Sequence, residues 1–313
     1  SYFFIKMGLN IEALIWSIYK MKGKLPQVKD YDTVYNVAED EFKDAIIKIK
    51  KNRKQLKHLK TLPVVVQRSD EWFDMRKNML TASDTYNAII KSKTLVKTKA
   101  KKIVKRIKAK ALTWGIMFEP IATNIYAKEH NDITVYDFGV IRSTDKDIEF
   151  YGASPDGITA LGVMLEIKCP ISRKIQEDYI KKDYMAQVQG QMAVCKLTDC
   201  DFAEFEFEIV ETKEEFLKLE EKYCGIIVVD KDDDCKFDFY TEIGLTPLEC
   251  YLSALNLNDG NIIYWKLRKM QVQRIVFDKN NWKEYYKPKI LDFWETVNNY
   301  EHSDEDDFRS DSD

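Results

Sequence analysis

The 313-residue chain is long enough to bury a substantial core, as one large domain or as one domain with additions. With 45% hydrophobic and 32% charged residues, it has the composition of a globular, soluble and highly charged protein. The net charge of −3 hides a strong segregation of charge. Lys91–Lys110 holds ten Lys or Arg and no acid, and Glu301–Asp313 holds seven acids and one Arg. A basic block in a nearly neutral chain indicates a local contact with a polyanion.

The cysteine and histidine counts bear on metal sites and on the compartment. The six cysteines are scattered without a Cys-x-x-Cys pair, and the chain has three histidines. These counts disfavour a zinc site and a four-cysteine iron–sulfur cluster. Free cysteines in a reducing, intracellular compartment are the simplest account. No signal peptide is apparent, and the apolar run near Ile11–Tyr19 is too short and too interrupted to span a bilayer, so we expect no membrane contact.

Residues 1–62 are predicted to be an N-terminal helical addition. Apolar residues recur at helical spacing over Ile11–Ile18, and a second helix is expected from about Ala38 to Lys60. This second helix is rich in lysine. We interpret the lysines as a solvated helix face in preference to a DNA contact. Pro63 ends the helix, and 64–67 is predicted to be a short strand.

A predicted helix over Asp70–Met79 is followed by the tetrapeptide TASD, which is expected to begin the next helix. Thr81 and Ser83 are favourable N-cap residues. A helix N-terminus with hydroxyls and free N–H groups can bind phosphate, and Arg76 would add a bidentate charge. From these residues alone, a plainly capped helix remains the preferred interpretation.

A basic stretch and a long helix come next. Lys91–Lys110 carries an apolar stripe, so a helix there would turn its lysines outward, either along a DNA backbone or as solvated surface, and the sequence favours neither. Trp114–Glu129 is predicted to be a strong helix, and Glu119 within it is the first acid of interest. Strands over 132–140 and 148–151 are expected to lead into the following segment.

The segment Tyr151–Pro170, YGASPDGITALGVMLEIKCP, holds the most informative motif. Turn residues before an apolar, β-prone run predict a β-hairpin, with Asp156 entering it and Glu166 and Lys168 on its second strand. Side chains alternate along a strand, so Glu166 and Lys168 share one face. Two acids and a lysine there fit a metal-assisted phosphodiester hydrolase, because hard oxygen ligands suit Mg²⁺ or Mn²⁺ and the lysine can orient or deprotonate water. Taken alone, this spacing more often marks an exposed strand face.

The remaining chain is predicted to alternate helices and strands. A helix bent near Asp183 is expected over Ile175–Cys195. On it Gln187 and Gln191 share a face, while Gln189 points away. From the residues alone, Gln189 and Gln191 are interpreted as ordinary helix surface. Further elements are expected at Phe202–Val210 (strand), Glu211–Lys222 (charged helix), Gly225–Val229 and Lys236–Tyr240 (paired strands), Thr246–Leu255 (helix), Trp265–Phe277 (strand) and Trp282–Tyr300 (closing helix). The acidic residues 301–313 are predicted to be a disordered tail.

Four blocks of the sequence, in order, resemble the lambda-exonuclease (YqaJ-type) viral recombinase family of PD-(D/E)xK nucleases. The central block is GASPDG…LEIKCP. The others are RSDEWFDMRKNMLTASD at 68–84, WGIMFEP at 114–120 and YMAQVQGQM at 184–192. The resemblance extends over residues 68–210, and four ordered blocks are far more specific than any single one.

The resemblance implies both a fold and a reaction. The fold would be α/β with a restriction-endonuclease-like core, a mixed central sheet flanked by helices, in a domain over residues 63–300. The activity would be Mg²⁺-dependent hydrolysis of DNA phosphodiester bonds, with Mn²⁺ able to substitute. The enzyme would act as a 5′→3′ exonuclease on double-stranded ends, in recombination or DNA end processing.

The resemblance also assigns roles at the metal site. Asp156 and Glu166 would ligate the metal, with the carbonyl of Ile167 as a further ligand. Glu119 would complete the site directly or through water. Lys168 would activate or position the attacking water.

Other roles implied by the resemblance concern the glutamine helix and the DNA end. Gln187 would support the lysine or bond a phosphate. Arg76 and Ser83, with Thr81 matched less closely, would hold the terminal 5′-phosphate.

The expected partners are double-stranded DNA with free ends, a single-strand annealing recombinase and further copies of the chain. The lysine-rich, asparagine-bearing composition suits a large DNA virus or a phage, whose protein would act in the host cytoplasm or nucleus.

Two alternatives remain open from the sequence. A restriction-like or structure-specific endonuclease of the same fold would cut circular DNA and would not depend on Arg76. A non-enzymatic DNA-binding protein on an inactive nuclease fold is the second. The intact set of Glu119, Asp156, Glu166 and Lys168 argues against it, because a decayed site usually loses an acid first.

Overall fold

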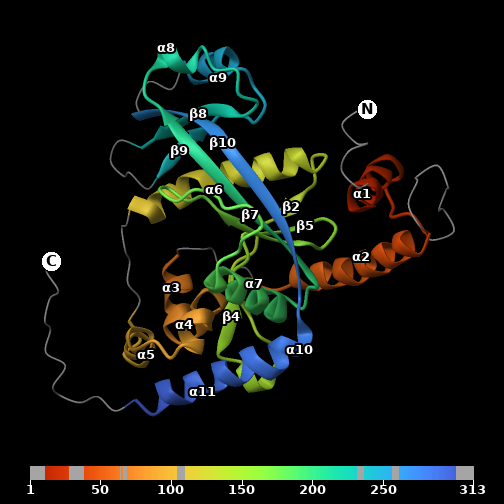
Figure 1. Ribbon diagram of the computed structural model, residues 1–313, viewed down its shortest axis with the longest axis vertical. Coiled ribbons are helices and arrows are strands. Elements are labelled where there is room, and N and C mark those ends of the chain that lie inside the picture. The colour runs from red at the N-terminus through yellow and green to blue at the C-terminus, as the bar shows by residue number, and fades with distance from the viewer. Residues whose placement is uncertain are drawn as a thin grey trace, which may run out of the picture.

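The structure, a computed structural model, describes residues 11–27, 39–63, 65, 69–103, 110–230, 236–255 and 261–300. The acidic segment 301–313 lies outside these ranges, and so does most of the strand expected at 64–67. Residues 104–109 of the basic stretch also lie outside them. Figure 1 shows two long strands through the middle of the molecule, with α8 and α9 at one end of them and α11 at the other.

Two sheets form the centre of the described part of the chain. The larger is seven-stranded, in the order β2 (Val135–Tyr136), β5 (Gly157–Thr159), β6 (Met164–Lys168), β7 (Asp199–Val210), β10 (Asn261–Val276), β8 (Cys224–Val229) and β9 (Phe237–Tyr240). The smaller is three-stranded, in the order β1 (Leu80–Thr81), β4 (Tyr151–Ala153) and β3 (Ile141–Arg142). β6 and β7 pair in parallel, and the other pairs of the larger sheet are antiparallel. The expected α/β architecture, a mixed sheet flanked by helices, is confirmed.

The helices of the described ranges surround these sheets. They are α1 (Ile11–Lys22), α2 (Glu39–Leu59), α3 (Asp70–Lys77), α4 (Thr85–Ile89), α5 (Lys93–Ala100), α6 (Lys110–Glu129), α7 (Lys182–Cys195), α8 (Lys213–Phe216), α9 (Pro247–Ala254), α10 (Lys279–Asn281) and α11 (Lys287–Asn298). A π-helical segment, Trp282–Tyr286, leads into α11. None of the described helices is both long and apolar enough to cross a membrane.

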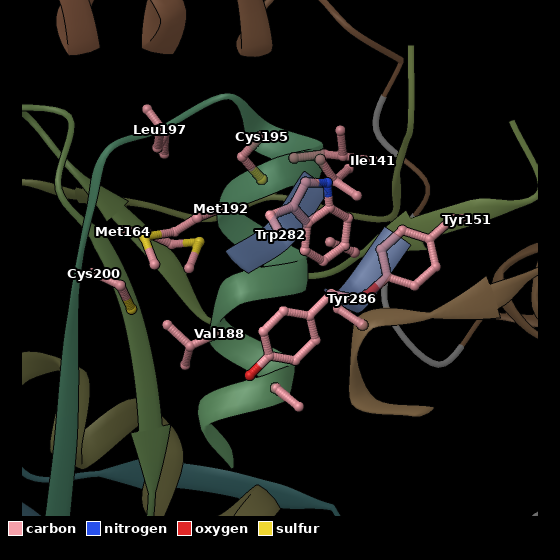
Figure 2. Close-up of a cluster of buried hydrophobic side chains, with 14 of the residues drawn as sticks. Ile141, Tyr151, Met164, Val188, Met192, Cys195, Leu197, Cys200, Trp282 and Tyr286 are labelled. Carbon is pink, nitrogen blue, oxygen red and sulfur yellow. The ribbon is translucent and has the colours of Figure 1, made fainter. Parts of the chain in front are cut away.

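The two faces of the sheet are covered by different helices. On one face, Met164 of β6 and Cys200 of β7 pack against Val188 and Met192 of α7, together with Trp282 (Figure 2). On the other face, Leu165, Ile167 and Phe205 pack against α6. The alternation predicted for β6 is therefore present, and it turns Glu166 and Lys168 towards α7.

The N-terminal helices share the core of the sheet. Ile15 of α1 and Ile46 of α2 are buried in the same apolar cluster as α6 and the sheet. A partly exposed ion-pair network reinforces this contact, since the Arg274 guanidinium of β10 donates two bonds of 2.8 Å to Glu12 and one of 2.6 Å to Asp201. α1 and α2 are thus packed onto the sheet rather than held only by a linker.

Two predicted helices are shorter than expected. α7 begins at Lys182, not Ile175, because Ile175 is buried as an anchor and Asp178 has a positive φ of 53° that breaks a helix. The charged helix expected over Glu211–Lys222 is reduced to α8, a single turn whose Phe216 is buried. Charged residues beyond that turn have no apolar face to bury.

α7 packs tightly against β4 at Gly190. A Cβ atom there would lie 2.0 Å from the Tyr151 hydroxyl and 3.1 Å from Thr85 Oγ1, two atoms that already form a buried hydrogen bond. Helix α7 can therefore carry only glycine at this contact without a shift of the neighbours.

Replacing Gly190 by Ala is expected to destabilise the protein. Overpacking costs about 1–3 kcal/mol, which exceeds the gain of about 1 kcal/mol from helix propensity. Gly115→Ala in α6 is the matched control, because nothing lies within 4 Å of its Cβ position, so this substitution should stabilise. Thermal unfolding of both variants tests the contact. Equal shifts of the melting temperature would contradict it.

Candidate active site

Glu166 and Lys168 form the centre of the site on β6. The antiparallel hairpin of β5 and β6 is confirmed, with Gly157 opposite Leu165. Glu166 is 1% exposed, and its Oε1 accepts a 2.5 Å hydrogen bond from Lys168 Nζ. The two side chains that the alternation predicted on one face therefore form a partly buried ion pair.

Helix α7 places two glutamines against Glu166. Gln187 Nε2 donates to Glu166 Oε1 at 2.6 Å, and Gln191 Nε2 donates to Glu166 Oε2 at 2.7 Å. The Oε1 atom of Gln187 lies 3.5 Å from Lys168 Nζ. Both oxygens of the carboxylate are thus held in fixed positions by the facing helix.

The interpretation of Gln189 and Gln191 as ordinary helix surface is wrong, since both are buried. Gln189 points away from the site, as expected: it donates to the carbonyl of Val276 and accepts from the N–H of Asp278. Gln191 is a site residue that the resemblance did not assign. Its spacing of four from Gln187 was the signal, because residues four apart share a helix face.

Asp156 is positioned by the turn between β4 and β5. Its Oδ2 accepts a 2.7 Å hydrogen bond from the N–H of Ile167, which ties the carboxyl group to the β6 backbone beside Glu166. Burial, together with the charges of Glu166 and Glu119, raises the pKa of Asp156 well above its usual range. The site therefore concentrates negative charge in a poorly solvated place.

Glu119 reaches the same region from α6, on the opposite face of the sheet. Its charge acts on Asp156, and it also contributes, after burial, to the raised pKa of the Cys169 thiol that follows Lys168. The helix continues through Pro120. Glu119 therefore lies near enough to Asp156 to act on its carboxyl group electrostatically.

The donors fit a divalent cation by their chemistry. Asp156 and Glu166 supply carboxylate oxygens, and a cation would relieve the repulsion that contributes to the raised pKa of Asp156. In the ranges that the structure describes, no three Asp, Glu, His or Cys side chains lie close enough together to hold an ion. Both oxygens of Glu166 already accept hydrogen bonds from Lys168 and from the glutamines of α7. A cation bound by Glu166 would compete with these donors.

The ammonium form of Lys168 is favoured in this arrangement. Burial alone would lower the pKa of this lysine, but the charges of Glu166 and Asp156 and the hydrogen bond to Glu166 outweigh it and raise the pKa. Lys168 Nζ also lies 5.1 Å from the centre of the Tyr184 ring. As a cation, Lys168 is placed to orient groups near Glu166.

Arg76, Thr81 and Ser83 lie together at a second place. Arg76 Nη2 donates to Thr81 Oγ1 at 3.3 Å, and Thr81 Oγ1 is 2.9 Å from Ser83 Oγ. The helix expected to start at TASD is short, a 3-10 turn over Ala82–Asp84 followed by the five residues of α4. Thr81 pairs with Gly152 of β4, and the four residues from Gly152 to Asp156 span at most about 14 Å.

Asp84 was not foreseen in this second cluster. It accepts a 2.8 Å hydrogen bond from Thr81 and pairs with Lys99 at 2.9 Å. Burial would raise the pKa of Asp84, but the charge and hydrogen bond of Lys99, the hydrogen bond of Thr81 and the charge of Arg76 together lower it. A carboxylate therefore already occupies part of the positive field of Arg76.

One family model matches the central part of the chain. Residues 71–201 match the family model of the YqaJ-like viral recombinase domain. This part of the chain is similar to that domain. The resemblance predicted from four sequence blocks is thereby confirmed, and every assigned site residue lies inside the matched range.

A viral protein and bacterial exonucleases are also similar to this chain. An uncharacterized protein of Acanthamoeba polyphaga mimivirus is 26% identical, over 79% of this chain and 55% of the relative, so the chain spans about half the length of that relative. Crystal structures of the alkaline exonuclease LHK-Exo from Laribacter hongkongensis, and of LHK-Exo in complex with dAMP, give TM-scores of 0.49 and 0.48 at 21% identity, over 74% of this chain and 93% of theirs. A phage-related exonuclease from Haemophilus somnus gives 0.42 at 12% identity, over 70% of this chain and 93% of that one.

The basic stretch of the YqaJ-like domain is partly neutralised where it is described. Lys99 forms an ion pair with Asp84, and Lys91 forms one with Asp292 of α11 at 2.7 Å. The apolar stripe is only partly within the described residues, where Val96 of α5 is buried. The two interpretations of this stretch, a DNA track and a solvated surface, both stay predictions.

Proposed function

We propose that the chain is a metal-dependent deoxyribonuclease that hydrolyses phosphodiester bonds at the ends of double-stranded DNA. The observation that carries the proposal is the hydrogen-bonded cluster of Glu166, Lys168, Gln187 and Gln191 beside Asp156, within a YqaJ-like domain. Acids with a neighbouring lysine are the groups that metal-assisted attack of water on a phosphodiester requires.

In this proposal each side chain has a separate task. Asp156, Glu166 and the carbonyl of Ile167 would hold Mg²⁺ or Mn²⁺, and Glu119 would complete the site directly or through water. The cation, when bound, supplies Lewis acidity and lowers the pKa of coordinated water. The Lys168 ammonium orients the attacking water and faces the charge that develops on the phosphate. Gln187 and Gln191 fix the rotamer of Glu166.

The experiment that tests the role of the second glutamine is Gln191→Met. Loss of a hydrogen bond to a charged group costs about 1.5–3 kcal/mol, so turnover should fall roughly 10- to 150-fold if the bond acts in the transition state. Gln189→Met is the matched control, because its bonds go to Val276 and Asp278 and not to Glu166. Steady-state cleavage assays should separate the two. Equal losses of turnover would mean that both glutamines only stabilise the helix.

We further propose that the enzyme acts 5′→3′ on ends, with Arg76, Thr81 and Ser83 binding the terminal 5′-phosphate. Arg76 and Lys99 together carry one more positive charge than Asp84 removes, so the cluster keeps a net attraction for an anion. A terminal phosphate carries more charge than an internal one and would be preferred.

Arg76→Ala tests the end pocket. Wild type should degrade 5′-phosphorylated linear duplex faster than 5′-hydroxyl duplex, by the roughly 10- to 150-fold that about 1.5–3 kcal/mol represents. The substitution should slow the first reaction towards the second and leave the second unchanged. If wild type treats both ends alike, the pocket has another role, and the endonuclease alternative gains support.

The wider setting of the reaction is also a proposal. A viral recombinase domain and a viral relative favour a role in recombination or end processing inside an infected host cell, in concert with a single-strand annealing protein. Assembly of several copies around DNA would raise processivity. An inactive DNA-binding scaffold is the competing function, and it would bind DNA ends without any Mg²⁺-dependent loss of substrate.

A further inference from the structure

The loop over residues 171–181 joins the strand of Lys168 to the helix of Gln187. It replaces the first part of the helix expected there, and it is held in place at two points. Ile175 is buried beneath it, and Glu177 pairs at 2.8 Å with Lys269 of β10. The loop is therefore anchored on both sides although it has no regular structure.

This loop forms one wall of a hollow of about 330 Å³. The hollow is lined by Arg173, Lys174, Tyr179, Lys181, Tyr184 and Glu204. Arg173 pairs with Glu204, which is buried on β7 opposite Lys168. Lys174 and Lys181 have no ion pair among the described residues, so the hollow keeps a net positive charge.

Tyr184 links the hollow to the candidate active site. Its ring centre lies 5.1 Å from Lys168 Nζ, 5.6 Å from the guanidinium carbon of Arg173 and 5.8 Å from Lys181 Nζ. One aromatic ring therefore lies within 6 Å of the proposed catalytic lysine and of two cations of the hollow. Tyr179, the second aromatic residue of the lining, is 51% exposed and is open to contact from outside.

We infer that the hollow is a subsite for one unpaired nucleotide of the cleaved strand, next to the scissile phosphodiester. Its size lies at the lower end of small-ligand pockets, roughly 300–1,000 Å³, and it suits a single nucleotide unit rather than a duplex. The exposed ring of Tyr179 can stack on a base, and the lysines can contact the flanking phosphate. This inference rests on the proposed nuclease function of the adjoining site.

The combination of groups favours a nucleotide over a bare anion. Lysines alone would bind phosphate without reading a base, but Tyr179 and Tyr184 add π-faces to the same cavity. Every base has a π-face, so such a subsite tolerates any sequence, as an enzyme that degrades DNA of any composition requires. An unpaired nucleotide is also the state in which a strand can separate from its complement near a cleavage site.

Binding of a short, fluorescently labelled single-stranded oligothymidylate to the full chain tests the inference. The titration is done by fluorescence anisotropy in EDTA, so no cleavage is involved. The hollow variant is Tyr179→Ala with Lys181→Gln. The matched control is Tyr285→Ala with Lys289→Gln, because Tyr285 is 45% exposed and Lys289 Nζ lies 5.2 Å from its ring.

The hollow variant should bind oligothymidylate at least about tenfold more weakly, the scale of losing one stacked base, and the control variant should bind as wild type does. The slope of log affinity against log salt should fall by about 0.7 for the lost lysine contact. Thymidine 5′-monophosphate should compete better than inorganic phosphate. Unchanged melting temperatures show that both variants fold.

Two results would overturn the inference: equal binding by the hollow and control variants, or equal competition by inorganic phosphate and the mononucleotide. Cleavage of linear duplex by wild type in Mg²⁺ is measured in parallel. If wild type cleaves and the hollow variant binds normally, the subsite alone fails. If wild type does not cleave but the hollow variant loses oligonucleotide binding, the proposed nuclease function fails and the hollow stands as a nucleic-acid site.

Discussion

Asp156→Asn is expected to abolish cleavage of linear duplex DNA in Mg²⁺, by more than about 10³-fold, the scale of losing the main electrostatic stabilisation of a site. The amide oxygen can still accept the hydrogen bond from the N–H of Ile167, so the turn should keep its shape. The charge that would hold the cation is removed. DNA binding measured in Ca²⁺ should stay near the wild-type value, because in the proposed site the acids would hold metal and not phosphate.

Calcium provides the control for this variant. Ca²⁺ is larger and a poorer activator of water, so wild type should bind DNA in Ca²⁺ without cutting it. Glu166→Ala should lose cleavage as completely as Asp156→Asn does. Near-normal turnover by either variant in Mg²⁺ would show that the metal assignment is wrong.

Lys168→Met carries the second-largest expected effect. A positioned acid–base group contributes about 10²- to 10⁴-fold to rate, and the turnover number should fall by that amount. Methionine keeps most of the apolar stem of the lysine side chain, so the surrounding packing should persist. Metal affinity, measured by titration with Mn²⁺, should change little, because Lys168 donates to Glu166 and is not itself a ligand.

The Lys168 variant also has a structural risk that a second readout resolves. Removing one partner of a partly buried ion pair is destabilising, so the melting temperature is measured beside the rate. A loss of bound Mn²⁺ as large as in the Asp156 variant would mean that the lysine serves the structure of the site. Loss of turnover with retained metal supports its role in positioning water.

The local part of the site could be predicted from sequence because its determinants are local. The turn residues before β6 and the alternation along it place Glu166 and Lys168 on one face, as observed. The spacing of four along α7 puts Gln187 and Gln191 on one side of the helix. The resemblance supplied the role of Gln187, whereas the burial of Gln191 against Glu166 depends on how α7 packs on the sheet.

Other features could not be predicted because they depend on contacts between distant segments. Asp84 enters the Arg76 cluster because Lys99 of α5 folds back to pair with it. The late start of α7 follows from the burial of Ile175 and the pairing of its loop with β10. No spacing of residues in the sequence predicts either contact.

The most direct test of the proposed function is digestion of linear and covalently closed duplex DNA by the wild-type chain, with and without Mg²⁺ and with the label at either end. The proposed function predicts Mg²⁺-dependent loss of the linear form, with early release of a 5′ label, and no cutting of the closed circle. Cutting of the closed circle at a comparable rate would contradict the exonuclease assignment. Intact linear DNA in Mg²⁺ would contradict nuclease activity altogether.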